Sequence, residues 1–195
     1  REEIRAVIRR AHALGMPAVL GGPSASTAPE DYPEADIIHV GELGDATSAI
    51  LGRIDASPSR PDRQIVLETS RRLPLDRFPP PAYRLIDLRR YLLASIQFSS
   101  GCPFTCEFCD IPALYGRRPR LKTSRQILAE LDAIVAAGAR GAVYFVDDNF
   151  IADRRAAAEL LPHLIEWQQA RGYPLRLSCE GVVGRHAGRG APSPG

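Results

Sequence analysis

Three of the four cysteines in the 195-residue chain lie within eight residues, as Cys102, Cys106 and Cys109, in the spacing C-x3-C-x2-C. An odd number of thiols cannot all pair internally, and the chain is not a short Cys-rich secreted one, which disfavours a disulfide framework. Closely spaced thiolates suit soft metals, above all iron–sulfur clusters and zinc. Because a four-iron cluster normally takes four thiolates, three would leave one iron open to bind a substrate.

Two other metal sites fit the spacing less well. A structural zinc site usually has paired C-x2-C steps and four protein ligands, but this chain has one x2 step, and Cys179 lies 70 positions further on. Bacterial ferredoxins use C-x2-C-x2-C, which the x3 step breaks. The pattern therefore favours a three-thiolate iron–sulfur site, with zinc and no metal as alternatives. We interpret Cys179 as a buried strand residue rather than a fourth ligand.

The composition sets broad limits. Lysine and arginine number 25 against 23 aspartates and glutamates, a net charge of +2 that argues neither for nor against nucleic-acid binding. The hydrophobic content of 45% is enough for one ordinary domain or two small ones. No apolar run is long enough to span a bilayer, and no signal-peptide layout is present. Thiols intended for a cluster fit a reducing cytoplasm.

The first quarter of the chain predicts part of an α/β domain. Apolar residues share one helical face over residues 2–14, and short buried strands are expected at 17–22 and 36–41, with a helix near 46–53. This order is typical of the end of a doubly wound parallel domain, which we assign to residues 1–56.

Glycine-rich turns follow both predicted strands. Gly21, Gly22 and Pro23 follow the first strand, and Glu42 follows the second. Open α/β sheets bind ligands at the carboxyl ends of their strands, so these residues are candidates for a ligand site. The alternative is ordinary turn chemistry.

Residues 57–91 are rich in proline and are predicted to be an extended linker. The apolar run 92–98 then predicts a strand that leads into the cysteines, as expected for a barrel whose functional residues follow its strands. A long loop over 110–123 precedes a helix capped by Thr123 or Ser124.

A further buried strand at 142–146 ends in Asp147 and Asp148. Adjacent carboxylates repel each other, so we expect them to bind a cationic ligand or to cap the next helix, although Asp153 is a better cap for that helix over 153–171. A third strand, over 175–180, places Glu180 at its end. The barrel domain is assigned to residues 92–183, and residues 184–195 to a disordered tail.

Three blocks of sequence carry a resemblance to a known family. They are the C-x3-C-x-aromatic-C signature with Phe108 at the aromatic position, the segment 95–101 before it, and the segment 144–150. The chain resembles the cobalamin-binding radical S-adenosylmethionine (SAM) proteins, and most closely the group that includes the hopanoid 2-methyltransferases. Residues 21–23 and 41–45 are similar to the last strands of that family's cobalamin domain.

The resemblance implies a [4Fe–4S] cluster on Cys102, Cys106 and Cys109, with SAM on the fourth iron. It implies that Phe108 lies against the adenine region, that the SAM shell includes Asp147, Asp148 and Glu180, and that the cobalamin side includes Gly21, Gly22, Pro23 and Glu42. The implied fold is the C-terminal part of a Rossmann-like cobalamin domain, followed by about three β/α units of a partial TIM barrel.

The implied activity is cobalamin-dependent methyl transfer to an unactivated carbon of a small, lipid-like substrate. An electron donor such as flavodoxin or ferredoxin is implied as a partner. The implied location is the cytoplasm, or a membrane surface reached through the substrate.

The chain departs from the family at both ends, and we expect it to be a truncated relative. It lacks the early half of the cobalamin domain, and residues 181–195 do not resemble the rest of the barrel. A radical SAM oxidoreductase that does not methylate, and an inactive metal-binding fragment, remain alternatives.

Overall fold

A computed structural model describes residues 1–181, and the predicted tail over 184–195 lies outside the described residues. The chain divides into two compact units. Unit 1 contains Arg1–Pro79 and Pro103–Arg120, and unit 2 contains Pro80–Cys102 and the chain from Leu121 onward. The cysteine segment therefore crosses the boundary between the units in sequence, with Cys102 in unit 2 and the two other cysteines in unit 1.

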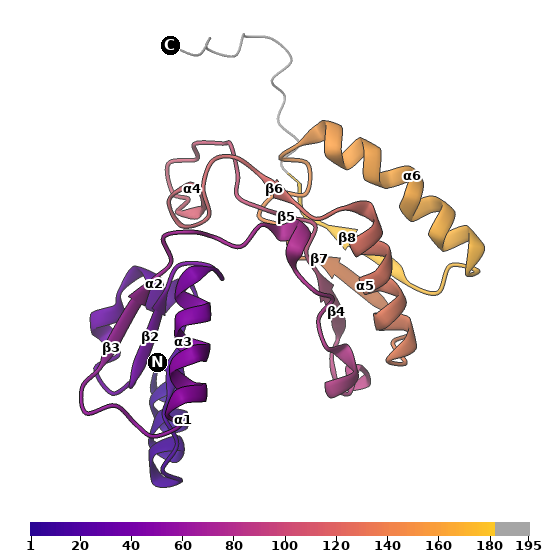
Figure 1. The fold of residues 1–195 in the computed structure, drawn as a ribbon. Coiled ribbons are helices and arrows are strands. Elements are labelled where there is room, and N and C mark those ends of the chain that lie inside the picture. The colour runs from indigo at the N-terminus through magenta and orange to yellow at the C-terminus, as the bar shows by residue number, and fades with distance from the viewer. Residues whose placement is uncertain (182–195) are drawn as a thin grey trace. The chain divides into compact units, whose positions relative to one another are not determined.

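Unit 1 is built on a three-stranded parallel sheet in the order β1-β2-β3 (Figure 1). Apolar residues of helix α1 at positions 4, 8 and 11 pack on one side of the sheet, against the cluster around Tyr32 and Ile38. Gly15, with φ of 71°, follows the end of that helix. Helix α3 packs against β2 and β3. The elements of unit 1 are α1 (Glu2–Ala13), β1 (Val19–Leu20), α2 (Pro23–Thr27), β2 (Ile37–Val40), α3 (Asp45–Ala56), β3 (Ile65–Glu68) and α4 (Ile111–Leu114).

Strand β3 differs from the sequence prediction, which placed a linker over residues 57–91. It pairs with β2 in parallel, with Ile65 beside Ile37 and Glu68 beside Val40. Its side chains alternate between half-buried and exposed, as an edge strand requires. The strand has four residues and lies among prolines and arginines, so its period-2 signal is weak. Three short 3₁₀ helices, at Leu75–Arg77, Tyr83–Leu85 and Leu88–Arg90, also lie in the segment that was predicted to be a linker.

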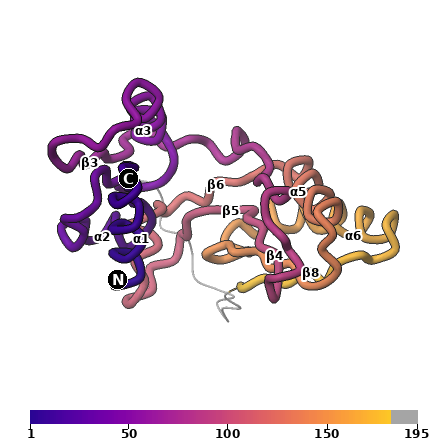
Figure 2. Tube along the Cα trace, turned by 90° about the horizontal axis from the view of Figure 1, so that it is seen from below, coloured from indigo at the N-terminus to yellow at the C-terminus, as the bar shows by residue number. Residues whose placement is uncertain are grey.

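Unit 2 is built on a second three-stranded parallel sheet, in the order β4-β7-β8. Helices α5 and α6 pack against each other, and both views show them side by side (Figures 1 and 2). A mixed α/β fold with parallel sheets is therefore confirmed. The elements are β4 (Leu93–Ile96), β5 (Ser99–Ser100), β6 (Arg120–Leu121), α5 (Ser124–Ala136), β7 (Ala142–Phe145), α6 (Arg154–Ala170) and β8 (Arg176–Cys179), and β6 begins at the last residue of unit 1.

Helix caps in unit 2 follow the sequence signals. Thr123 forms a capping box with Gln126 at the start of α5, and the Asp153 carboxylate accepts a hydrogen bond from the Ala156 amide at 3.0 Å at the start of α6. The two helices bury their apolar faces against Val143 and Phe145 of the central strand. Trp167 lies in this core. No helix among residues 1–181 is both long and apolar enough to cross a bilayer.

Candidate functional site

The predicted site residues of unit 2 gather at the carboxyl ends of its strands. Cys102 follows β4 and β5, Asp147 and Asp148 follow the central strand β7, and Glu180 follows β8. Carboxyl ends of parallel strands lie at one edge of a sheet, which is where barrels and open α/β sheets place their functional groups. Their roles in a site at this edge stay a prediction.

The three cysteines differ in their surroundings. Cys102 is buried, Cys106 is exposed and Cys109 is half-buried, and all are free thiols. The Cys109 amide donates to the Cys106 carbonyl oxygen at 3.1 Å, which forms a turn between them. Within residues 1–181, no three histidine, cysteine, aspartate or glutamate side chains form a group arranged to hold a metal ion. Three unpaired thiols on one short segment fit a cluster by donor chemistry, and ligation by these residues stays a prediction.

Asp147 is buried, with 5% of its surface exposed, and it binds the chain just upstream of the cysteines. Its Oδ2 accepts from the Phe98 amide at 3.1 Å, and its Oδ1 accepts from the Ser99 hydroxyl at 2.5 Å and from the Ser99 amide. Burial raises the pKa of the Asp147 carboxyl, and the hydrogen bonds from Ser99 and Phe98 act in the opposite direction.

Asp148 binds the residue that immediately precedes Cys102. Its Oδ2 accepts from the Gly101 amide at 2.9 Å. Gly101 has φ of 94°, a left-handed conformation that favours glycine at the turn into the cysteines. The two adjacent aspartates therefore both bind the backbone between residues 98 and 101.

Glu180 is exposed at the end of β8, and its backbone carbonyl accepts from the Phe150 amide at 3.0 Å. A hydrogen bond to Glu180 is the main cause that raises the pKa of Tyr144, on the central strand. Tyr144 was not among the residues predicted from the sequence. Its place on the strand that precedes the two adjacent aspartates is a signal that could have indicated it.

A buried ion pair lies where the chain returns to unit 2. Lys122 Nζ lies 2.6 Å from Glu130 Oε1, and the two side chains are 5% and 1% exposed. The other carboxylate oxygen, Glu130 Oε2, has no hydrogen-bond partner among the described residues. Burial raises the pKa of Glu130, against the lowering effect of Lys122. Lys122 ends a basic run over residues 116–122, which the sequence predicts to line a ligand or to be solvated, and the burial of Lys122 corrects that prediction for this residue.

Gly21, Gly22 and Pro23 are exposed at the end of β1, where Gly22 has φ of 101° and Pro23 begins α2. Behind them, His39 is buried, and a side chain on Gly21 would contact it. His39 Nε2 lies 3.1 Å from Thr69 Oγ1 and within hydrogen-bond distance of a second threonine, Thr47. This polar network at the strand ends of unit 1 was not predicted.

Glu42 is mostly buried and forms ion pairs within unit 1. Its carboxylate lies 3.2 Å from Arg72 Nε and also binds Arg120. The Arg72 guanidinium donates in addition to the carbonyl oxygens of Leu114 and Tyr115, at 2.8 and 2.9 Å. Glu42 and Arg72 therefore fix the segment downstream of the cysteines. Arginine alone gives no sequence signal for such a role.

Phe108 is the last of the predicted site residues, and Cys179 is the fourth cysteine, which was predicted not to be a ligand. Phe108 is 91% exposed between the second and third cysteines. Cys179 lies in β8 as expected, but it is exposed, which corrects its assignment as a buried residue. The β8 strand is at the edge of its sheet, so its last residues lack a neighbour on one side.

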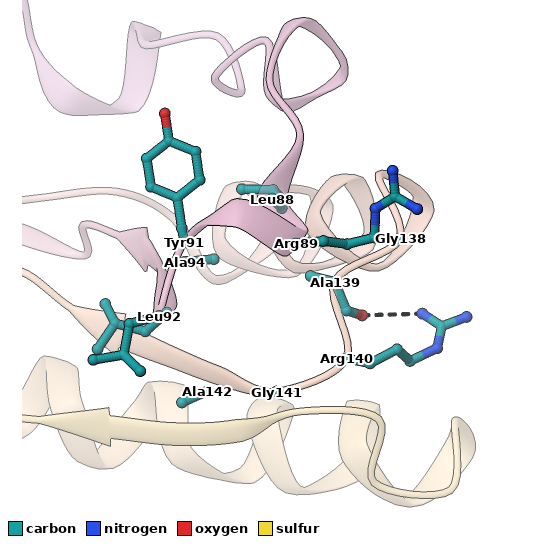
Figure 3. Close-up of a pocket in the computed structure, with 11 residues that line it drawn as sticks. Leu88, Arg89, Tyr91, Leu92, Ala94, Gly138, Ala139, Arg140, Gly141 and Ala142 are labelled. Atoms are coloured by element: carbon teal, nitrogen blue, oxygen red, sulfur yellow. Dashed lines mark hydrogen bonds between the residues drawn. The ribbon is translucent and has the colours of Figure 1, made fainter.

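A pocket of about 360 Å³ lies at the opposite end of the sheet in unit 2, around the amino ends of β4 and β7 (Figure 3). The Arg140 guanidinium donates a hydrogen bond to the Ala139 carbonyl oxygen at 3.0 Å, drawn as a dashed line in Figure 3. The pocket contains none of the three cysteines. Since barrels place functional groups at carboxyl ends, we assign it no role in the site.

The chain is similar to parts of known methyltransferases. No protein-family model matches the chain. The hopanoid C-2 methylase of Rhodopseudomonas palustris is 54% identical over 183 residues, which cover 94% of this chain and 35% of the methylase. An uncharacterized methyltransferase of Synechocystis is 37% identical over 185 residues, which cover 94% of this chain and 34% of the relative.

A solved structure shares the fold. The radical SAM methyltransferase TsrM from Kitasatospora setae, solved with cobalamin and a [4Fe–4S] cluster bound, matches 90% of this chain and 40% of its own, with a TM-score of 0.67 and 21% identity. The chain spans about a third of the length of the curated relatives described above. The resemblance found in the sequence is confirmed, and the chain is a homologue of part of the hopanoid C-2 methylase.

Proposed function

We propose that this chain contributes the cluster-binding part of a cobalamin-dependent radical SAM methyltransferase. The observation that carries the proposal is the set of three unpaired thiols on one short segment, the first of which, Cys102, follows β4 and β5 of the parallel sheet in unit 2. Cys102, Cys106 and Cys109 would hold a [4Fe–4S] cluster as thiolates. When bound, the cluster supplies an electron for reductive cleavage of SAM, and cobalamin supplies a methyl group.

The other residues have binding and positioning roles in this proposal. Phe108, exposed between two of the cysteines, would pack against the adenine of SAM. Glu180, with Tyr144 beside it, would accept a hydrogen bond from the ammonium group of SAM. Gly21, Gly22 and Pro23 would allow close approach of cobalamin to the backbone of unit 1. Glu42 would act on that side through its arginine partners.

The two units would correspond to two functional regions. Residues 1–79 of unit 1 would supply the end of a Rossmann-like cobalamin domain, and unit 2 with the cysteine segment would supply the first three β/α units of a partial TIM barrel. The substrate would be a small lipid-like molecule, and a cytoplasmic flavodoxin or ferredoxin would deliver the electron. The TsrM fold supports the assignment of the two regions, and the name of the hopanoid C-2 methylase homologue supports a lipid-like substrate.

The proposal is tested by SAM cleavage in the purified chain. After anaerobic reconstitution with iron and sulfide, the protein is reduced with dithionite in the presence of SAM, and 5′-deoxyadenosine is followed by mass spectrometry. Wild type and Cys179→Ala should form the product, and Cys106→Ala should not. The Cys179 variant is the matched control because that thiol lies outside the three-cysteine motif.

Other outcomes would contradict the proposal in defined ways. The assigned site would be excluded if the chain bound zinc in place of iron. It would also be excluded if Cys106→Ala cleaved SAM at the wild-type rate. If a cluster forms but SAM stays intact, the chain is an inactive cluster-binding fragment. If SAM is cleaved but the full-length relative yields a product without an added methyl mass, the enzyme is a radical SAM oxidoreductase.

A further inference from the structure

Four hydrogen-bond donors directly upstream of Cys102 converge on two adjacent carboxylates. Asp147 accepts from the amides of Phe98 and Ser99 and from the Ser99 hydroxyl, and Asp148 accepts from the Gly101 amide. Every donor lies within four residues of the first predicted cluster ligand. This contact pattern gives the two aspartates a backbone-binding role.

Burial makes the Asp147 contacts costly to lose. Ser99 and Ser100 are each 2% exposed, Phe98 is 3% exposed and Asp147 is 5% exposed. Water has little access to these groups, so a donor that loses the carboxylate would be left without a partner. Hydrogen bonds to an ionised acceptor are also shorter and stronger than neutral ones. The end of β4 is therefore bound firmly to the end of β7.

The same short stretch is also fixed from its other side. The Lys122 amide donates to the Phe98 carbonyl oxygen at 2.8 Å, and the Lys122 side chain is held by Glu130 of α5. The backbone of Phe98 therefore forms hydrogen bonds through both its amide and its carbonyl oxygen. The backbone that leads to Cys102 has little freedom to move before the first thiol is reached.

From these contacts we infer that Asp147 and Asp148 are positioning residues for Cys102, acting through the backbone of residues 98–101 rather than by contact with SAM. The inference rests on the proposed function, and it changes the role that the family resemblance implies for the two aspartates. It also explains how two neighbouring carboxylates are tolerated, because each faces amide donors. Cys102 is then the fixed ligand, and the exposed Cys106 is presented on a less constrained turn.

Thiol labelling of the cluster-free chain tests this inference without enzyme activity. The full chain is stripped of iron with a chelator under reducing conditions and treated with N-ethylmaleimide, and labelling at each cysteine is followed by mass spectrometry. In wild type, Cys106 should react quickly and Cys102 slowly. In Asp147→Asn and Ser99→Ala, Cys102 should react about tenfold faster, the factor expected when a charged hydrogen bond is lost. Cys106 should be unchanged.

The matched control is Asp132→Asn. Asp132 accepts a hydrogen bond from Trp167 Nε1 at 2.8 Å, so this variant also weakens unit 2 through a lost carboxylate, but not at the cysteine segment. Its Cys102 should react at the wild-type rate. An increase equal to that of Asp147→Asn would show that labelling follows general stability and would overturn the inference.

Unchanged Cys102 labelling in a folded Asp147→Asn protein would also overturn it and would return Asp147 to the SAM shell. If circular dichroism shows that Asp147→Asn does not fold, Ser99→Ala decides, because it removes only the hydroxyl donor. Failure of the proposed function is a separate result, since wild type would then bind no iron while the labelling differences would remain.

Discussion

Asp45 in unit 1 and Asp147 in unit 2 make similar hydrogen bonds in different surroundings. Each follows the central strand of a three-stranded parallel sheet and binds the backbone and a serine hydroxyl just beyond a neighbouring strand. Asp45 accepts from the Ser70 hydroxyl at 2.5 Å and from the amides of Ser70 and Arg71 at 3.0 and 3.1 Å. Asp147 does the same for Phe98 and Ser99.

Exposure to solvent determines the direction in which the pKa of each carboxyl group shifts. Asp45 is partly exposed, and the hydrogen bonds from Ser70 and Arg71 lower its pKa from 3.8 to about 2. Asp147 is buried, and burial raises its pKa in spite of similar hydrogen bonds. Similar donors therefore give opposite shifts, because desolvation outweighs hydrogen bonding only in the buried case.

The hydrogen bonds of Asp45 and those of Asp147 also have different structural roles. The Asp45 contacts close a turn in which Gly44 approaches the Arg71 carbonyl so closely that a side chain on Gly44 would clash with it. The Asp147 contacts fix the stretch that continues into Cys102. The buried arrangement, that of Asp147, has the larger desolvation cost, and it lies next to the first predicted cluster ligand.

Removing the buried carboxylate should have the largest effect. Asp147→Ala leaves three donors without an acceptor, and the free energy of unfolding of unit 2 should fall by roughly 3 kcal/mol or more, at ~1–3 kcal/mol for each buried unsatisfied group. Urea unfolding followed by the fluorescence of Trp167, the single tryptophan of the chain, measures this in unit 2. Asp45→Ala should have a much smaller effect, because water can reach its donors. Equal losses in the two variants would contradict the comparison.

The pH dependence of stability should have opposite signs for the two residues. The stabilisation from Asp45 is present above pH 3.8 and is lost as the pH falls through about 2, because its pKa is lowered on folding. The pKa of Asp147 is raised, so its stabilisation is greatest below its ordinary value and is lost as the pH rises through the folded pKa.

Denaturant unfolding of wild type, Asp45→Asn and Asp147→Asn between pH 3 and 7 measures both signs. The difference between wild type and Asp45→Asn should shrink toward low pH, and that between wild type and Asp147→Asn should shrink toward high pH. The same sign for both variants would refute the assigned role of burial.

Raising the salt concentration should change the stability of these contacts least, and mainly in unit 1. Arg71 lies 3.8 Å from Asp45 at the surface, and such pairs are weakened when the Debye length falls to ~3 Å near 1 M salt. Hydrogen exchange at the Ser70 amide should become slightly faster, whereas exchange at the Phe98 amide should not change. An equal response of both amides would indicate that Asp147 is more solvated than its burial suggests.

Much of the fold could be predicted from the sequence because the signals are local. The apolar face of α5, its Thr123 cap and the Asp153 cap of α6 are set by residues three or four positions apart. Strand β3 could not be predicted with the same rules. It consists of four residues at a sheet edge, and it is defined by its pairing with β2 rather than by its own pattern.

The site was predicted in part for the same reason. The cysteine spacing and the acids after β7 are local signals, and Cys102 and the two acids lie at the carboxyl edge of the sheet in unit 2. The partners of those acids, Phe98 and Ser99, lie almost 50 positions earlier, and the Lys122–Glu130 pair depends on how α5 packs. No local pattern marks such contacts, so only the fold could identify them.

The most direct test of the central claim is the iron and sulfide content of the reconstituted chain and its four single Cys→Ala variants. If Cys102, Cys106 and Cys109 hold the cluster, wild type and Cys179→Ala should each bind about four irons and four sulfides per chain, and the other three variants far fewer. Full iron content in a variant of one of those three cysteines, or its loss in Cys179→Ala alone, would contradict the assignment.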